Sequence, residues 1–365
     1  MNKEIEFKTF EVKKDEWSSS RFVSETFTGN LEQDQVLLKI DRFALTTNNI
    51  TYCAAGDMFG YWGFFPTEEG FGRVPVMGYS DVVASNHQDV QVGERLWGFY
   101  PMSNYLVVKA GKASQSNFFD VSEHRQQYAP IYSQYLRALA NPYYELARED
   151  HDLLLRGLYL TSWLVEDFMF DNETFGADSY LITSASSKTS IALGFAVKSR
   201  GEKEAIGITS ESNREFCKKL GCYSEIITYD EVSSLDASGS VVIVDMAGNL
   251  EVLRALHELF QEQVKYSCLI GTTHRDEIKG LLSLSSLPGA KPELFFAPSQ
   301  AQKRTEELGA GQLEKLIGQS LVDFQKYSDQ WLTVVRASGP ESIEATFSKL
   351  LNGQAPPSEG YILSA

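Results

Sequence analysis

The first 110 residues alternate between short apolar runs and turn-forming residues. Three runs have the β-branched and apolar character of strands: Val36–Ile40, Asp81–Ala84 and Tyr105–Val108. Glycine and proline recur between Gly56 and Gly78, where they interrupt any longer regular element. This part of the chain is predicted to be a domain of short strands.

The segment from residue 122 to residue 170 changes character. Glycines become rare, and Tyr132, Tyr135, Leu136 and Leu139 are spaced so that a helix would carry them on one face. The pattern predicts helix in this segment.

From about Ala177 the chain alternates between strands and helices. The expected strands are 179–183, 205–208, 241–245 and 268–271, and the expected helices are 189–199, 213–220 and one that carries Leu250, Leu253 and Leu256. Such alternation is typical of βαβ units with a parallel sheet. Two more amphipathic helices follow, one through Leu313 and Phe324 and one that begins at Pro340 and ends near Gly353.

Composition narrows the class of protein. A chain of 365 residues favours two domains, and a formal charge of -16 disfavours binding to nucleic acid or to an anionic membrane. No apolar stretch approaches the ~20 residues of a membrane span, and the N-terminus lacks a signal-peptide core. The four cysteines include no C-x-x-C pair and fit free thiols in a reducing cytosol. We therefore expect a cytoplasmic protein.

The strongest local signal is the stretch Tyr180–Ser190, in which an apolar strand gives way to small residues and then a helix. In a dinucleotide-binding fold, the pyrophosphate lies at such a turn, against the helix N-terminus. Serines replace the usual glycines, and Lys188 adds a positive charge. The candidate cofactor residues are Ser184, Ala185, Ser187, Lys188 and Thr189. A Ser/Thr-rich cap on an ordinary helix is the alternative interpretation.

The end of the second expected strand concerns the adenosine ribose. NAD sites usually carry an acid here for the ribose 2′-hydroxyl. This chain instead has two hydroxyls, an amide and a guanidinium, which suit the 2′-phosphate of NADP: Thr209, Ser210, Asn213 and Arg214. A capped helix with a surface arginine is the alternative.

Together these stretches resemble the medium-chain dehydrogenase/reductase superfamily, in its zinc-free, quinone-reductase-like branch, and most closely the DUF2855 family. The resemblance is carried by Val36–Ile40, Ala44–Ile50, Val74–Gly78, Val92–Leu96, Lys219–Gly221, Glu225–Tyr229, Asp245–Gly248 and Leu269–Gly271. It implies an α/β fold with a Rossmann-type parallel sheet domain and a GroES-like β-barrel domain. The barrel would comprise residues 1–135 and 295–365, and the Rossmann domain residues 136–294. Gly271, at a later strand end, joins the expected cofactor site.

The resemblance also bears on metals. The zinc-dependent branch binds catalytic zinc through cysteine, histidine and a later cysteine or acid, whereas the matching positions here are Thr46, Tyr79 and Leu160. These side chains do not make a zinc site. No metal is expected.

Without zinc, hydrogen bonds from the protein would polarise the substrate. Tyr79 and Tyr52 are candidate proton donors, and Asn49 takes a position that the resemblance places near the nicotinamide. Packing of each tyrosine in the core is the alternative. The segment Asp57–Pro66, rich in aromatics and glycine, is either a lid over a hydrophobic or planar substrate or a loop that buries its own side chains.

The sequence thus predicts a zinc-independent, NADP(H)-dependent oxidoreductase that reduces a carbonyl, enone or quinone-like small molecule in an interdomain cleft. A non-redox lyase or aldolase acting on a β-hydroxycarbonyl is one alternative, and a non-catalytic nucleotide-binding protein is another. A homodimer is expected through the edge of the Rossmann sheet near residues 265–290, where Leu281, Leu282, Leu284 and Leu287 are apolar.

Overall fold

The computed structural model describes residues 4–246, 248–270 and 286–365. The chain forms two compact units, residues 1–154 with 333–365 and residues 155–332. The sequence placed the boundaries at 135 and 295 instead. Residues 295–332 fold with the second unit because their helices pack on α2 (Glu149–Asp171): Arg304 pairs with Asp167, and the Phe324 ring stacks on Tyr159 at 4.8 Å.

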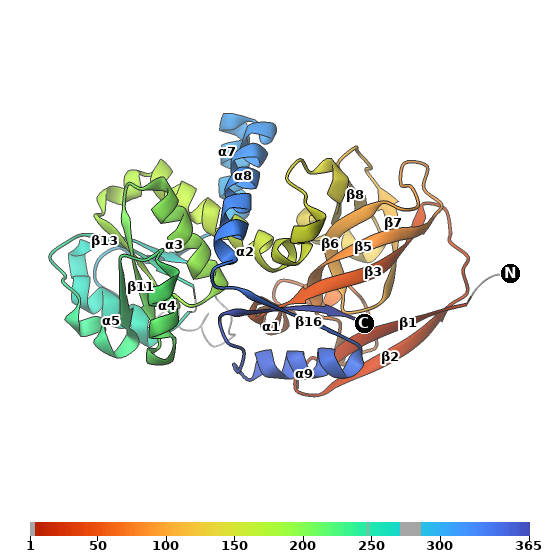
Figure 1. Cartoon of the computed structure of the whole chain (residues 1–365), viewed down its shortest axis with the longest axis horizontal. Helices are drawn as coiled ribbons and strands as arrows, with labels where there is room; N and C mark the ends of the chain where they lie inside the picture. The colour runs from red at the N-terminus through yellow and green to blue at the C-terminus, as the bar shows by residue number, and fades with distance from the viewer. Residues whose placement is uncertain (1–3, 247, 271–285) are drawn as a thin grey trace. The chain divides into compact units, whose positions relative to one another are not determined.

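The first unit contains a closed antiparallel barrel (Figure 1). Its six strands follow the order β3-β5-β6-β9-β8-β7, and β7 pairs back to β3. The strands are β3 (Gln35–Leu45), β5 (Pro75–Ser85), β6 (Arg95–Pro101), β7 (Tyr105–Gly111), β8 (Asn117–Asp120) and β9 (Gln134–Arg137). This barrel confirms the expected GroES-like domain.

Shorter elements flank the barrel. A three-stranded sheet has the order β2-β1-β4, and β17 extends the barrel sheet from β3 and pairs with β16 in parallel. The bounds are β1 (Ile5–Lys13), β2 (Ser20–Phe27), β4 (Phe71–Gly72), β16 (Thr333–Ser338) and β17 (Glu359–Ser364), with helices α1 (Thr47–Ala54) and α9 (Pro340–Leu351).

The helix predicted between residues 122 and 148 is wrong. This segment contains β9 and several single 3-10 turns, and helix begins only at Glu149. Tyr135 lies in the barrel core, whereas Leu139 is 84% exposed, so the supposed apolar face is divided between core and solvent. Alternation along a short strand placed Tyr135 inward, and the helical spacing was coincidental.

The second unit contains a six-stranded sheet of parallel strands in the order β12-β11-β10-β13-β14-β15. The strands are β10 (Ser179–Ile182), β11 (Glu204–Thr209), β12 (Glu225–Thr228), β13 (Val241–Asp245), β14 (Val264–Leu269) and β15 (Pro292–Leu294). This is the strand order of a Rossmann fold, in which the order reverses between β10 and β13. The predicted parallel sheet is confirmed.

Helices cover both faces of this sheet (Figure 1). Leu181 and Ile243 face α5 (Leu250–Phe260), whereas Ile182 and Val244 face α2 and α3 (Lys188–Arg200). The remaining helices of this unit within the described residues are α4 (Arg214–Leu220), α7 (Ala297–Leu308) and α8 (Ala310–Ser328). Both sheet faces are therefore apolar, and the polar residues collect where the strands end.

Candidate functional site

The turn between β10 and α3 lies at the point where the strand order reverses, which is where open parallel sheets bind ligands. Ser184 adopts a left-handed conformation with φ of 50°, which is usually left to glycine. The amide of Ala185 donates to the Ile208 carbonyl at 2.9 Å. The Ser187 hydroxyl caps α3 by accepting from the Ser190 amide at 3.1 Å. The backbone thus makes the sharp turn without a glycine.

The serine hydroxyls of this turn mostly bind the protein itself. Ser187 Oγ donates to Ser190 Oγ at 2.8 Å, and Ser190 Oγ donates to the Thr183 carbonyl at 2.8 Å. Lys188 and Thr189 are the first residues of α3, and both are half-buried. The start of α3 thus combines backbone amides, the positive end of the helix dipole and a lysine side chain, which are groups that favour an anion.

Tyr223, which was not predicted from the sequence, binds the backbone of this turn. The Tyr223 hydroxyl donates to the Ala185 carbonyl at 2.9 Å. A Cβ on Gly194 or Gly207 would come within 2.8 or 3.0 Å of the Tyr223 ring, so both glycines make room for it. In the sequence, the one signal for this contact is that two glycines on neighbouring elements, Gly194 and Gly207, are followed by a tyrosine nearby in the chain.

The second predicted turn is joined to the first. Asn213 Nδ2 donates to Ser186 Oγ at 3.0 Å, so the ends of β10 and β11 are connected by side chains. Thr209 is buried, and Ser210 Oγ lies 3.0 Å from Ser212 Oγ. The structure therefore brings the two groups of predicted cofactor residues together, with the exception of Gly271, which lies outside the described residues.

Arg214 is held by two carboxylates. Its Nε donates to Glu211 Oε2 at 2.8 Å, and its Nη2 lies 2.7 Å from Glu231 Oε2. Hydrogen bonds to Glu231 and Glu211 raise the pKa of Arg214. The sequence reasoning missed Glu231, which is 17 residues further along the chain and comes close only because β11 and β12 are neighbours.

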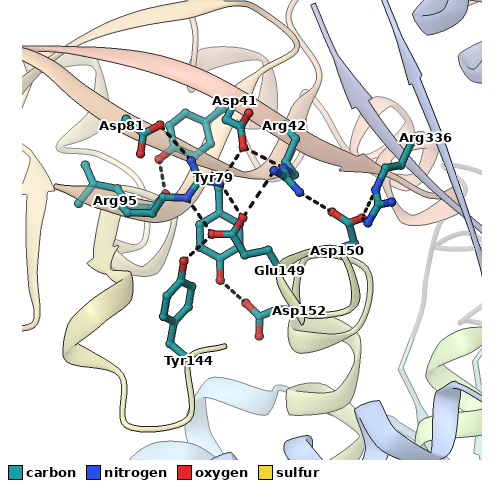
Figure 2. Close-up of polar contacts among 12 residues, drawn as sticks. Asp41, Arg42, Tyr79, Asp81, Arg95, Tyr144, Glu149, Asp150, Asp152 and Arg336 are labelled. Carbon is teal, nitrogen blue, oxygen red and sulfur yellow. Dashed lines mark hydrogen bonds and ion pairs between the residues drawn. The ribbon is translucent and has the colours of Figure 1, made fainter. Parts of the chain in front are cut away.

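A second polar cluster surrounds Tyr79 in the barrel unit (Figure 2). The Tyr79 hydroxyl donates to Asp152 Oδ2 at 2.8 Å, and both residues are buried. The Arg95 guanidinium lies over the Tyr79 ring, 5.2 Å from its centroid. The Tyr79 phenol is thus paired with a carboxylate.

Arg95 is the centre of this cluster. It makes a two-pronged contact with Glu149, at 2.7 and 2.6 Å, and also contacts Asp41 at 2.7 Å and Asp81 at 3.1 Å. Burial opposes ionisation of Asp41, but hydrogen bonds from Arg95 and Arg42 outweigh it and hold the pKa of Asp41 below its usual value. These contacts fix several charges in one arrangement.

The first turn of α2 supplies three acids of the cluster. Glu149, Asp150 and Asp152 are all buried there. Asp150 bridges two arginines from different strands, Arg42 at 3.1 Å and Arg336 at 2.5 Å, as Figure 2 shows. The start of α2 is thereby attached to β3, β6 and β16.

Asn49 and Tyr52 lie on α1, and their contacts are structural. Asn49 Oδ1 accepts from the Thr46 amide at 2.7 Å, and Nδ2 donates to the Pro75 carbonyl at 2.9 Å. The Tyr52 ring lies 4.6 Å from that of Tyr61, and burial raises the pKa of Tyr52. The roles of Tyr79, Asn49 and Tyr52 toward a substrate stay predictions.

The aromatic segment 57–66 is mostly packed inward. Trp62, Phe64 and Phe65 are buried, whereas Met58 and Phe59 are about half exposed at 49% and 54%. Three of the segment's aromatic side chains are thus buried, and two of its large apolar residues are exposed.

Thr46, Tyr79 and Leu160, which the resemblance places at zinc-ligand positions, have other surroundings in the structure. Thr46 caps α1, Tyr79 pairs with Asp152, and Leu160 offers no donor. Within the described ranges, no three His, Cys, Asp or Glu side chains are grouped so as to hold a metal ion. In the same ranges, no helix is both long and apolar enough to span a membrane.

The antiparallel barrel and the Rossmann sheet are the two domains that the resemblance to the medium-chain dehydrogenase/reductases implies. The chain belongs to the DUF2855 family, a protein family of unknown function, which matches residues 43–356. No curated protein matches the sequence.

Solved structures share the fold at low identity. CurA from Vibrio vulnificus is 14% identical over 98% of both chains, with a TM-score of 0.61, and a second CurA structure contains NADPH. A variant of Etr1p in complex with NADP and crotonyl-CoA is 10% identical over 100% of both chains, with a TM-score of 0.58. A quinone oxidoreductase from Coxiella burnetii is 16% identical over 99% of this chain and 100% of its own, with a TM-score of 0.54.

Proposed function

We propose that this protein is a zinc-independent, NADP(H)-dependent oxidoreductase that reduces a carbonyl, enone or quinone-like small molecule. The observation that carries the proposal is the turn at the strand-order reversal, where the N-terminus of α3 carries Lys188 and is joined to the second turn through Asn213 and Ser186. CurA with NADPH and Etr1p with NADP and crotonyl-CoA support the same class of chemistry.

The residues at the two turns fit a dinucleotide in different ways. At the first turn, Ser184, Ala185, Ser187 and Thr189 would line the pyrophosphate site, and backbone amides at the start of α3 and the Lys188 ammonium would hold the pyrophosphate. At the second, Thr209, Ser210, Asn213 and Arg214 would hold the 2′-phosphate, and Gly271 is the further predicted contact. NADPH, when bound, would supply the hydride.

Tyr79 is the proposed proton donor. Its hydroxyl is already oriented by Asp152, and a phenol held by a carboxylate can pass a proton between substrate oxygen and that carboxylate. Tyr52 and Asn49, both buried on α1, are proposed to shape the site.

The test is a titration of the purified protein with NADPH, followed by fluorescence, and then a screen of enones and quinones for NADPH oxidation. Saturable binding with substrate-dependent oxidation is the expected result. Binding without oxidation by any substrate would favour the non-catalytic alternative. No binding of either nucleotide would favour the lyase or aldolase, whose chemistry needs no redox cofactor.

Zinc independence has its own measurement. Thr46 and Tyr79 lack the thiolate and imidazole of a zinc site, so elemental analysis of protein purified without a metal-affinity tag should find less than 0.1 zinc per chain, about the level of contamination. One zinc per chain would contradict the proposal.

A homodimer through the Rossmann edge is also proposed. β15 is the last strand of the described sheet, and Leu294 and Phe296 at its end are 57% and 65% exposed. Of the four leucines on which the sequence prediction relied, Leu281, Leu282 and Leu284 lie outside the described residues, and Leu287 is buried in the core of the unit. Light scattering at micromolar concentration should give twice the mass of the chain, and replacing Leu294 and Phe296 by serine should give a monomer.

A further inference from the structure

Two carboxylates hold one guanidinium at the turn that follows β11. Arg214 Nη2 contacts Glu211 Oε2 at 2.8 Å and Glu231 Oε2 at 2.7 Å, and it also donates to Thr228 Oγ1 at 3.3 Å. We call Glu211 and Glu231 the carboxylate clamp. Its charge of -2 exceeds the +1 of Arg214, so the group expected to attract a phosphate carries a local charge of -1.

One carboxylate of the clamp, that of Glu231, also binds the backbone. Glu231 Oε2 accepts from the Thr228 amide at 3.2 Å, as part of a capping box at the end of β12. Arg214 in turn lowers the pKa of Glu231 through its hydrogen bond, so this carboxylate stays ionised near neutral pH. Glu231 is therefore fixed beside Arg214 rather than a passing surface contact.

Arg214 still has capacity for a further acceptor. In the described part of the chain its hydrogen bonds use Nε and Nη2, which leaves the Nη1 donors for a ligand. A 2′-phosphate that binds there brings about two negative charges close to both carboxylates. The neutral 2′-hydroxyl of NAD(H) meets no such repulsion and can donate to a carboxylate.

We propose that the carboxylate clamp determines cofactor specificity: Glu231 and Glu211 weaken NADPH binding selectively and so limit the preference that Arg214 provides. This inference rests on the proposed function. It predicts that Arg214 favours NADPH while the clamp opposes it, so the two substitutions should move the NADPH-to-NADH affinity ratio in opposite directions.

The test compares dissociation constants of NADPH and NADH for the wild type and for Glu231→Gln. Glutamine keeps the acceptor for the Thr228 amide but loses the charge. NADPH affinity should rise about three- to tenfold, and NADH affinity should change less than about twofold. Glu215→Gln is the matched control, because Glu215 lies on α4 but pairs with Lys218 at 3.2 Å. Arg214→Ala should reduce NADPH affinity towards that of NADH.

The outcomes separate the clamp from the proposed function. Equal effects of Glu231→Gln and Glu215→Gln would refute the clamp, because general surface charge would then explain both. Weaker NADPH binding by Glu231→Gln, with an unchanged melting temperature, would also refute it, because Glu231 would then only position Arg214. If no variant binds either nucleotide, the proposed function fails as well.

Discussion

Two helices of this protein begin in opposite electrostatic surroundings. α2 begins with Glu149, Asp150 and Asp152, all buried, so acids of the protein itself already compensate the positive end of its dipole. α3 has no acidic residue in its first turn and begins with Lys188 behind a serine cap. The two helix starts therefore differ in charge: acidic residues occupy the first turn of α2, whereas a lysine and no acidic residue occupy the first turn of α3.

The difference shows why a helix N-terminus is not by itself a ligand site. At α2, the acids and the arginines of β3, β6 and β16 satisfy one another, and the result is structural anchoring. At α3, a turn of small residues braced by Tyr223 lies at the strand-order reversal. The acids of α2 thus anchor that helix, whereas the first turn of α3 carries no acidic residue that would repel an anion.

The largest effect is expected on stability, at the start of α2. Replacing Glu149 by alanine leaves Arg95, whose side chain is only 15% exposed, without its two-pronged partner. Removing one partner of a buried ion pair typically lowers the free energy of unfolding by about 3–5 kcal/mol. Urea denaturation checks this, with the exposed Glu145→Ala as the control. A loss below about 0.5 kcal/mol would show that the cluster is not a stability element.

The next largest effect is expected at the start of α3. Lys188→Ala should weaken NADPH binding about ten- to a hundredfold, with a smaller loss at high salt, because a charge-assisted hydrogen bond to pyrophosphate is removed. Titrations at two ionic strengths measure both quantities. Lys198→Ala, at the other end of α3, is the control. An unchanged affinity for Lys188→Ala would remove the residue from the pyrophosphate site.

The smallest effect is expected at Tyr223, whose hydroxyl binds the backbone of the β10–α3 turn. Tyr223→Phe removes the hydrogen bond to the Ala185 carbonyl but keeps the ring that fills the space at Gly194 and Gly207. NADPH and NADH affinities should both fall about three- to tenfold, because the pyrophosphate is common to both. Calorimetric titration with each nucleotide tests this. A change in only one of them would contradict a role in the turn.

The sequence predicted the periodic parts of the fold well. Strand 241–245 has the expected bounds, and β10, β11 and α3 differ by one or two residues, because buried parallel strands and the helices between them have strong local patterns. The segment after residue 122 was misjudged because four bulky residues mimicked a helical face.

The candidate sites were predicted only in part. Residues that follow one another in a turn, such as Ser184–Thr189, could be found from the sequence alone. Asp152, Glu231 and Tyr223 could not, because each meets its partner through tertiary contacts, over as many as 73 residues for Tyr79 and Asp152. The charge of Arg214 was read correctly, but its compensation by Glu231 depends on the pairing of β11 with β12.

The central claim is that the start of α3 binds the pyrophosphate of NADP(H). A crystal structure of the protein grown with NADPH tests it most directly. We predict pyrophosphate density at the β10–α3 turn, with the amides of the first turn of α3 and Lys188 Nζ within about 3.2 Å of phosphate oxygens. Well-ordered NADPH bound elsewhere, or crystals saturated with NADPH that leave this turn empty, would contradict it.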